Sequence, residues 1–306
     1  MAGIIPFDDR DGSLWYDGAL VPWREAKTHV LTHGLHYASC VFEGERIYAG
    51  RIFRHEEHTA RLFESARLLG MKIPYTEEEI ARACYEAADA QGIKDGYVRP
   101  VVFRGSEMMA VSAQAARIHV AIAVWQWPSY FNPAEKLKGI RLDFAQWRRP
   151  APDTAPTRAK AAGLYMICTL SKHAAEAKGY ADALMLDYRG LVAEATGANV
   201  FFIKDGHLHT PMPDCFLDGI TRQTVIALAA KRQIPVHERA ISPDELATFE
   251  ECFITGTAAE VTPVSEIGPY KFKPGVICET LMNDYTAEVH RPTGADAARQ
   301  RLNASV

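Results

Sequence analysis

The residues best suited to bind an anion lie at 217–222, where Leu-Asp-Gly-Ile-Thr-Arg leads straight into a helical pattern. The first amides of a helix have no partner inside the helix, and the helix dipole favours negative charge at that end. With the Thr221 hydroxyl beside them, these amides are suited to a phosphate. An ordinary helix start capped by Thr221 is the simpler interpretation of this segment taken alone. The small residues at 255–259, which follow a strand-like run, are a similar and weaker signal.

Lys160 is surrounded in the sequence by small residues, Arg158-Ala-Lys-Ala-Ala-Gly163. A lysine amine in a crowded apolar site loses its proton more readily and can form a Schiff base with a carbonyl compound. Taken alone, Lys160 is better explained as a solvated surface lysine.

Other motifs that carry chemistry are absent from the sequence. It contains no GxGxxG, no GxxxxGK[ST] and no GxSxG, so the usual dinucleotide, P-loop and serine-hydrolase signals are missing. The pairs His33-x-x-His36 and His55-x-x-His58 have a spacing that metal ligands can have, but no cysteine or carboxylate set completes either. We therefore expect polar loop or helix-face histidines and no metal, and a solvated pair at His207-x-His209.

The elements that must position these residues predict an α+β fold. Apolar periodicity and turn residues indicate, in order, a hairpin over 14–21, helices over 56–69 and 76–90, and strands over 97–104 and 117–127. The second half predicts helices over 163–177, 221–231 and 276–289, a short helix after Ser242, and strands over 183–187, 191–195, 200–204, 208–210 and 251–256. Thr76 and Glu79 form a capping box at a helix start.

Prolines cluster between residues 127 and 156, where they interrupt regular structure. The sequence therefore predicts a small domain over 1–129, a linking loop over 130–137, a large domain over 138–290 and a flexible tail over 291–306.

Composition indicates a globular protein and excludes several classes of partner. The 306 residues are 48% hydrophobic and 24% charged, and 34 basic against 38 acidic residues give a net charge of −4. No basic field favours nucleic acid or an anionic membrane, and no apolar run is long enough to cross a bilayer. The start of the sequence lacks the pattern of a secretory signal, and the six cysteines contain no CxxC pair. We expect a soluble cytoplasmic protein with reduced thiols.

Together, the separate signals resemble one family. Glu194-Ala-Thr-Gly-Ala-Asn199-Val-Phe201, then Leu208-His-Thr210, then the 217–222 segment match in residue and spacing the signature of class IV pyridoxal-phosphate aminotransferases. Within that class the chain most resembles the branched-chain amino acid aminotransferases. Further support comes from HGLHYASCVFEGERIY (33–48), HTARL (58–62), YVRP (97–100), RAKAAGLY (158–165) and TGTAAEVTPV (255–264).

This resemblance implies a fold and a reaction. The fold is the two-domain fold type IV, with a smaller N-terminal α+β domain, a larger C-terminal pseudo-barrel domain and pyridoxal 5'-phosphate in the cleft. The implied reaction moves the amino group of L-leucine, L-isoleucine or L-valine to 2-oxoglutarate, giving branched 2-oxo acids and L-glutamate.

The resemblance also implies a role for each residue near the cofactor. Lys160 is similar to the Schiff-base lysine, whose amine moves a proton between the substrate α-carbon and the cofactor. Glu194 is similar to the carboxylate that keeps the pyridine nitrogen protonated, so that the ring withdraws electrons. Arg61 corresponds to a phosphate ligand, because a guanidinium matches phosphate oxygens, and Tyr165 corresponds to a partner of the phenolic oxygen. The other expected cofactor-binding residues are Gly197, Asn199, Leu217, Gly219, Ile220, Thr221 and Thr257.

On the substrate side, Arg99 bears most directly on specificity. One site must accept both a branched aliphatic chain and the γ-carboxylate of glutamate, and an arginine can pair with the carboxylate or rest on aromatic rings. The α-carboxylate is expected to meet the Tyr97 hydroxyl and the amides of Thr257 and Ala258. Tyr37 is expected to reach across from a second subunit, which makes the active unit a homodimer or a higher homo-oligomer. The remaining expected substrate-binding residues are Phe42, Gly44, Arg46, Trp127 and Tyr130.

The sequence departs from the family pattern at one place and leaves alternatives open. Proteins of this type often carry Gly-Met-Gly-Val after YVRP, whereas this chain has Met-Met-Ala-Val at 108–111. Other class IV aminotransferases act on D-amino acids or (R)-amines, and an aminodeoxychorismate lyase uses the same lysine. The tyrosine–arginine pair of YVRP and the FEGxR stretch favour the branched-chain type, and an aromatic pocket disfavours the lyase. A binding protein without activity would be expected to lack Lys160 or Glu194.

Overall fold

The computed structural model describes residues 5–127 and 136–291, and the chain forms two compact units. Among the described residues, the first unit consists of 5–127 and 159–163, and the second of 136–158 and 164–291. The domain boundaries expected from the sequence remain a prediction, because most of the expected linking loop and of the expected tail lies outside the described residues.

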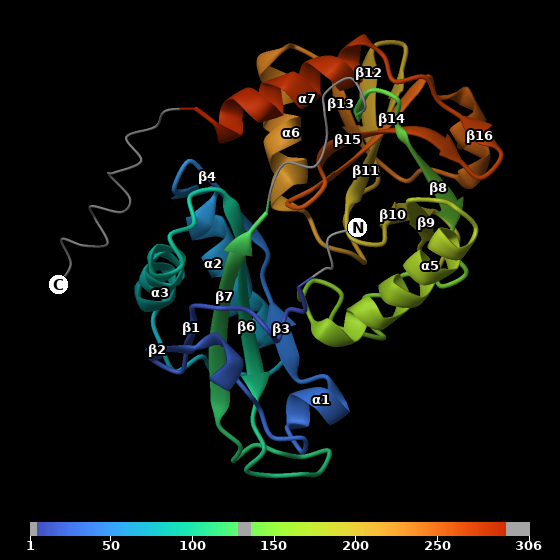
Figure 1. Ribbon diagram of the computed structural model, residues 1–306. Helices are drawn as coiled ribbons and strands as arrows, with labels where there is room; N and C mark the ends of the chain where they lie inside the picture. Colours follow the sequence, from blue (N-terminus) through green and yellow to red (C-terminus); the bar gives the residue numbers. More distant parts are fainter. Residues whose placement is uncertain (1–4, 128–135, 292–306) are drawn as a thin grey trace. The chain divides into compact units, whose positions relative to one another are not determined.

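The first unit is built on an antiparallel seven-stranded sheet in the order β2-β1-β7-β6-β4-β5, with β3 also pairing with β6. The strands are β1 (Ser13–Tyr16), β2 (Ala19–Pro22), β3 (Cys40–Phe42), β4 (Glu45–Tyr48), β5 (Arg51–Ile52), β6 (Gly96–Arg104) and β7 (Ile118–Gln126). The two long strands β6 and β7 run through the middle of this unit (Figure 1). The hairpin expected over 14–21 and both long strands are confirmed.

Alternation along β6 and β7 separates a core face from a face that carries polar groups. Val98 pairs with Val124 and Val102 with Val120, and all four side chains are fully buried. Successive side chains of a strand point to opposite faces. Tyr97 and Arg99, which belong to the expected substrate site, therefore share the other face with Trp125 and Ala123.

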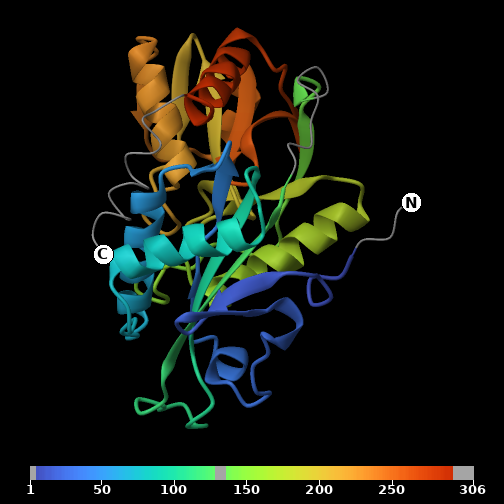
Figure 2. The ribbon, with the colours of Figure 1, turned by 60° about the vertical axis from the view of Figure 1, so that its left-hand side comes forward.

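Three helices complete this unit: α1 (His33–Tyr37), α2 (His55–Leu68) and α3 (Glu77–Ala90), with a short 3-10 turn at Trp23–Glu25. The expected capping box is present at α3, since the Thr76 hydroxyl accepts from the Glu79 amide and the Glu79 carboxylate accepts from the Thr76 amide. Figure 2 shows α3 lying across β6 and β7, which it contacts together with β1.

The second unit contains a nine-stranded sheet that closes on itself. The order is β10-β9-β8-β15-β14-β11-β12-β13, and a further pairing of β10 with β11 joins six of these strands into a ring. The strands are β8 (Ile140–Phe144), β9 (Asp182–Leu186), β10 (Val192–Ala195), β11 (Asn199–Lys204), β12 (His207–Thr210), β13 (Val236–Glu238), β14 (Glu251–Gly256), β15 (Glu260–Ile267) and β16 (Tyr270–Lys271). The expected α+β class with a barrel-like second sheet is thus confirmed.

Helices cover the outside of this ring, and nearly all residues of β9, β10, β11 and β14 are buried. The helices are α5 (Met166–Ala177), α6 (Ile220–Lys231) and α7 (Val276–Val289), with 3-10 turns at Ala162–Tyr165 and Pro243–Thr248. Helix α5 packs on β8 and β9, whereas α6 and α7 pack on β14 and on each other (Figure 1). One set of alternate residues forms the core inside, including Leu142, Val200, Phe202, Ile254 and Val264. Among residues 5–127 and 136–291, no helix is both long and apolar enough to span a membrane.

Candidate active site

Lys160 lies in a short segment, Ala159–Gly163, that packs into the first unit. Its backbone amide donates to Ser65 Oγ of α2 at 3.0 Å, and its carbonyl accepts from the Phe42 amide at 3.1 Å. The next residue, Ala161, forms an isolated β-bridge with Val41. The flanking alanines are buried, which explains why small residues surround the lysine. The side-chain Nζ lies 5.0 Å from the centroid of the Phe42 ring.

Arg61 is held by a buried carboxylate, Glu43, for which the sequence predicted no role. Glu43 is fully buried and accepts from Arg61 Nε at 2.6 Å, from Arg61 Nη2 at 2.9 Å and from His58 Nδ1 at 2.7 Å. Burial alone would raise the pKa of the Glu43 carboxyl, but Arg61 and His58 outweigh it and lower that pKa well below its usual range. The guanidinium expected to bind phosphate is therefore fixed in place. His55 contacts a different carboxylate, Glu45, at 2.6 Å, so His55 and His58 do not converge on one ligand.

Tyr97 and Arg99 form an aromatic–cationic group with Phe42 and Trp127. The guanidinium carbon of Arg99 lies 4.7 Å from the Phe42 ring centroid and 5.3 Å from that of Tyr97. Arg99 Nη2 donates to the Tyr97 hydroxyl at 3.3 Å, and the Tyr97 and Trp127 rings are 5.3 Å apart. A Cβ at Gly44 would lie 1.9 Å from the Tyr97 hydroxyl, so only glycine leaves room for it. The structure thus brings together five of the residues expected to contact substrate.

Arg46 has a supporting position in the same unit. It is 4% exposed, its Nη2 donates to the Trp127 carbonyl at 3.4 Å, and its guanidinium carbon lies 4.9 Å from the Tyr48 ring centroid. These contacts fix the backbone of Trp127 at the end of β7.

Tyr37 is on the outside of the first unit. Its side chain is 44% exposed, and its ring stacks on His33 with the centroids 4.6 Å apart. His33 also links α1 to the 108–111 segment, because its Nε2 is 2.9 Å from the Ala110 carbonyl. This histidine therefore anchors the segment in which the sequence departs from the family pattern.

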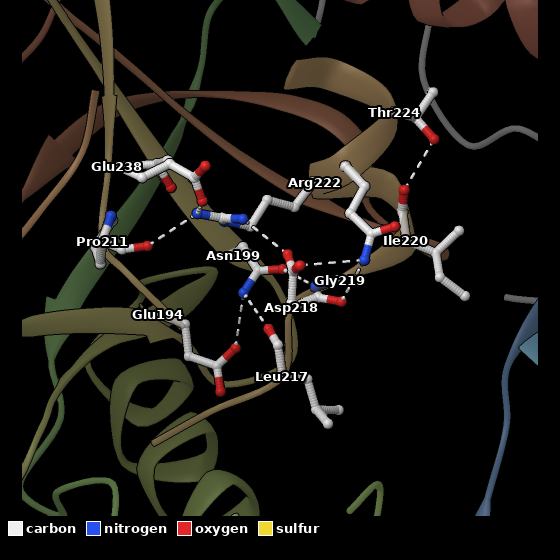
Figure 3. Close-up of polar contacts among 12 residues, drawn as sticks. Glu194, Asn199, Pro211, Leu217, Asp218, Gly219, Ile220, Arg222, Thr224 and Glu238 are labelled. Atoms are coloured by element: carbon white, nitrogen blue, oxygen red, sulfur yellow. Dashed lines mark hydrogen bonds and ion pairs between the residues drawn. The ribbon is translucent and has the colours of Figure 1, made fainter. Parts of the chain in front are cut away.

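In the second unit, Glu194 is buried between a cation and an amide. It is 8% exposed, Arg149 Nε lies 3.3 Å from its Oε1, and Asn199 Nδ2 donates to its Oε2 at 3.2 Å (Figure 3). Burial lowers the pKa of the Arg149 guanidinium, but Glu194 outweighs this and raises it. Arg149, which is 3% exposed, therefore keeps a charge beside Glu194. Nothing in the sequence marked Arg149, because it lies far from its partner along the chain, in a proline-rich stretch.

The 217–222 segment is a turn that ends in the first residues of α6. The helix begins at Ile220 with Gly219 as its N-cap, one residue earlier than expected, and Thr221 is not the cap. Because Gly219 has no side chain, it cannot satisfy the first amides of the helix. Those amides and the buried Thr221 hydroxyl form the donor set that the sequence predicted for an anion.

A second expected donor group lies in a hairpin turn of the same unit. Residues 257–259 join β14 to β15, which places the amides of Thr257 and Ala258 at the end of β14. Thr255, which precedes this turn, pairs with Asn199 across the sheet. Its buried Oγ1 has no hydrogen-bond partner among the described residues. A buried hydroxyl of this kind can be satisfied by a bound ligand.

These features fit pyridoxal 5'-phosphate. A helix start without a side-chain cap suits a phosphate, a buried carboxylate paired with Arg149 suits a protonated ring nitrogen, and the Thr255 hydroxyl lacks a partner among the described residues. Tyr165 lies at the end of the 3-10 turn before α5 and is half-buried, whereas Gly197 is an exposed turn residue between β10 and β11. Tyr130 lies outside the described residues.

The two units each hold one group of the expected site residues. Those in the first unit are Tyr37, Phe42, Gly44, Arg46, Arg61, Tyr97, Arg99, Trp127 and Lys160. Those in the second unit are Tyr165, Glu194, Gly197, Asn199, Leu217, Gly219, Ile220, Thr221, Thr257 and Ala258.

Comparison with known proteins shows the family of this chain. Residues 40–267 match the family model described as amino-transferase class IV. The chain is 43% identical over 301 residues to the branched-chain-amino-acid aminotransferase of Pseudomonas aeruginosa, covering 96% of this chain and 98% of that protein. It is 37% identical over 260 residues to the Escherichia coli K12 protein of the same name, covering 83% and 84% of the two chains.

Solved structures show the same relationship. The enzyme described as a branched-chain aminotransferase from Thermoproteus uzoniensis with norvaline superposes with a TM-score of 0.87 at 37% identity, covering 94% of this chain and 96% of that one. The branched-chain amino acid aminotransferase of Thermobaculum terrenum in its PLP-form gives a TM-score of 0.82 at 31% identity, covering 91% and 94%. The chain therefore belongs to the class IV aminotransferases and, within them, to the family of the branched-chain-amino-acid aminotransferases.

Proposed function

We propose that this chain is a branched-chain-amino-acid transaminase that uses pyridoxal 5'-phosphate. It transfers the amino group of L-leucine, L-isoleucine or L-valine to 2-oxoglutarate, which gives branched 2-oxo acids and L-glutamate. The observation that carries this proposal is Arg99 resting on the rings of Phe42 and Tyr97. Aromatic rings suit a branched aliphatic chain, and the guanidinium over them suits the γ-carboxylate of glutamate, so one site serves both donors.

The chain's own residues divide the work on the cofactor. When bound, the cofactor supplies an electron-poor ring that stabilises negative charge at the substrate α-carbon. The free amine of Lys160 would move the proton between the substrate α-carbon and the C4′ carbon of the cofactor. Glu194 would hold the proton on the ring nitrogen, and Arg149 pairs with Glu194. The residues proposed to hold the phosphate are Arg61, Ile220, Thr221 and Thr257, and Tyr165 donates to the phenolic oxygen.

The substrate is held by separate groups at its two ends. The Tyr97 hydroxyl and the amides of Thr257 and Ala258 bind the α-carboxylate. The side chain of the substrate meets Phe42 and the neighbouring aromatic residues, and Arg99 pairs with it when it ends in a carboxylate.

A substrate panel tests this function. Wild-type protein is expected to turn over L-leucine with 2-oxoglutarate with ping-pong kinetics, and Lys160→Ala is expected to abolish turnover. Arg99→Met should lower kcat/KM for 2-oxoglutarate about 10- to 100-fold, because a charge-assisted hydrogen bond contributes about 1.5–3 kcal/mol. Its half-reaction with leucine should change little. Turnover of D-alanine or (R)-1-phenylethylamine without leucine would identify another class IV aminotransferase, and release of pyruvate from aminodeoxychorismate would identify the lyase.

We further infer that the active form is a homodimer, or a higher homo-oligomer, in the cytoplasm. The exposed Tyr37 on α1 supports a subunit interface that completes the site. The six cysteines are all unpaired in the structure, which supports a reducing compartment.

A further inference from the structure

Asn199 lies where three parts of the second-unit site meet: Glu194, the end of β14 and the 217–219 turn. It is the first residue of β11, it pairs with Glu194 across the β10–β11 hairpin, and it pairs with Thr255 of β14 on its other side. The 217–219 turn passes directly over it (Figure 3). The side chain is 5% exposed.

The side-chain amide of Asn199 is used by the protein itself. Nδ2 donates to Glu194 Oε2 at 3.2 Å and to the Leu217 carbonyl at 3.0 Å, so both of its hydrogens are engaged. Oδ1 accepts from the Gly219 amide at 3.1 Å. No donor hydrogen of this side chain is left for a cofactor, although the family resemblance placed Asn199 among the cofactor-binding residues.

Gly219 is shaped to receive this contact. A Cβ at Gly219 would lie 2.2 Å from Asn199 Oδ1, so any other residue would displace the asparagine oxygen. The turn can therefore approach Asn199 closely only because position 219 has no side chain.

Arg222 holds the same turn from the opposite side. It is 1% exposed, and it donates to Asp218 Oδ1 at 2.7 Å, to Glu238 Oε2 at 2.6 Å and to the Pro211 carbonyl at 3.2 Å (Figure 3). Both side chains thus act on the 217–219 turn, but only Asn199 also contacts Glu194.

We propose that Asn199 is a positioning residue that couples Glu194 to the anion-binding turn, which consists of residues 217–219 and the first amides of α6. Asn199 does not itself bind the cofactor. Through Gly219 and Leu217 it fixes the direction of the first amides of α6, and through Nδ2 it fixes one oxygen of Glu194. The position of the carboxylate and the geometry of the phosphate donors then depend on each other. This inference rests on the proposed function, because it takes Glu194 as the partner of the cofactor's ring nitrogen and the start of α6 as the phosphate site.

Binding of inorganic phosphate to the full-length apoprotein, measured by calorimetry, tests the coupling without any turnover. Asn199→Ala is expected to weaken phosphate binding about five- to tenfold, because the lost ordering of the turn corresponds to the net contribution of about one hydrogen bond. Glu194→Ala, at a residue that does not itself contact the phosphate, should also weaken binding while Asn199 is present. The double variant should bind no more weakly than Asn199→Ala alone. Glu194→Gln, which keeps the shape of the side chain, serves as a second variant and should show a smaller loss of the same kind.

The matched control is Thr224→Val. Thr224 Oγ1 donates to the Ile220 carbonyl at 2.8 Å in the same helix, so the variant loses a buried hydrogen bond without touching the turn. It should leave phosphate binding unchanged. In the cofactor-loaded protein, Asn199→Ala should shift the pH midpoint of the cofactor absorbance, and Thr224→Val should not.

Several results would overturn the coupling. Strictly additive losses in the double variant would make Asn199 an independent ligand, and equal losses in Thr224→Val would reduce it to a general stabilising residue. If the wild-type apoprotein does not bind phosphate, the turn is not an anion site and there is nothing for Asn199 to couple. If phosphate binding is coupled as expected but the protein fails the substrate panel, the proposed function is contradicted and the coupling is not.

Discussion

Gly44 shows how a single position without a side chain can decide the form of the substrate site. The Tyr97 hydroxyl occupies the space that a Cβ at position 44 would need, and the same hydroxyl accepts from Arg99. The FEGxR stretch was recognised in the sequence by resemblance, but the reason for its glycine lies on a different strand. By contrast, Glu43, the residue before it, was not foreseen, because its buried pairing with Arg61 and His58 depends on how α2 lies against β3.

The first prediction follows from this close approach. Gly44→Ala should force the Tyr97 ring away from Arg99 and raise KM for L-leucine, with a loss of about 1–3 kcal/mol in the free energy of unfolding from overpacking. Steady-state kinetics and urea unfolding measure both effects. Adding Tyr97→Phe removes the clashing oxygen, so the double variant should be less destabilised than the sum of the two single variants. Additive losses would mean that Tyr97 does not limit position 44.

At the scale of elements, most helices and the long strands β6 and β7 were predictable because their signals are local, whereas the eight-residue strand β15 was not foreseen. The capping box at Thr76, the turn at 17–18 and the alternation of β6 and β7 each depend on residues close in sequence, and the structure confirms them. The strands between residues 40 and 52 were missed. They are two to four residues long. In β4 the charged residues Glu45 and Arg46 are both buried, each with a polar partner elsewhere in the unit, so no alternation of apolar and polar residues appears. Helix α6 begins at Ile220, next to the expected start near Thr221, but its N-cap is Gly219 and not Thr221.

Helix α2 begins with a buried contact that makes its attachment depend on pH. His55 Nδ1 lies 2.6 Å from Glu45 Oε2 of β4, and its Nε2 lies 3.1 Å from the Ala81 carbonyl of α3. Both neighbours are hydrogen-bond acceptors, so the contacts favour the ring with a hydrogen on each nitrogen, which is the cationic form. Burial lowers the pKa of His55, but Glu45 outweighs it, and the net effect raises that pKa.

A raised folded-state pKa means that His55 stabilises the protein below its unfolded pKa of about 6.5, and that this stability is lost as pH rises through the folded value. His55→Gln should therefore cost about 1.5–3 kcal/mol in the free energy of unfolding at pH 6, since it removes charged hydrogen bonds. The difference from wild type should shrink toward pH 9, as measured by urea unfolding. The exposed His173→Gln on α5 is the control and should show no such trend. A cost that is independent of pH would show that His55 is neutral in the folded protein.

For the whole molecule, the net charge of −4 conceals local groups of opposite sign. The first unit places Arg46, Arg61 and Arg99 on neighbouring elements, and each rests on a carboxylate, a carbonyl or an aromatic ring. The second unit holds helix amides and Arg149. Counting charges along the sequence gave no sign of a nucleic acid partner. The resemblance pointed to Arg61 and Arg99, whereas Arg149 was not foreseen, because these residues are scattered along the chain.

The assembly itself gives the last prediction, which asks whether Tyr37 acts on the site of its own chain or of a partner. Tyr37→Ala and Lys160→Ala should each have low activity alone, the first because the site loses an aromatic wall and the second because it loses the amine. If Tyr37 acts across a dimer interface, mixed dimers contain one site with both residues intact. Random exchange of equal amounts should then restore about a quarter of the wild-type activity, since half of the dimers are mixed and each has one good site of two. Mixtures that stay at the level of the single variants, with exchange confirmed by native mass spectrometry, would place Tyr37 in its own chain's site. Full activity of Tyr37→Ala alone would remove it from the site altogether.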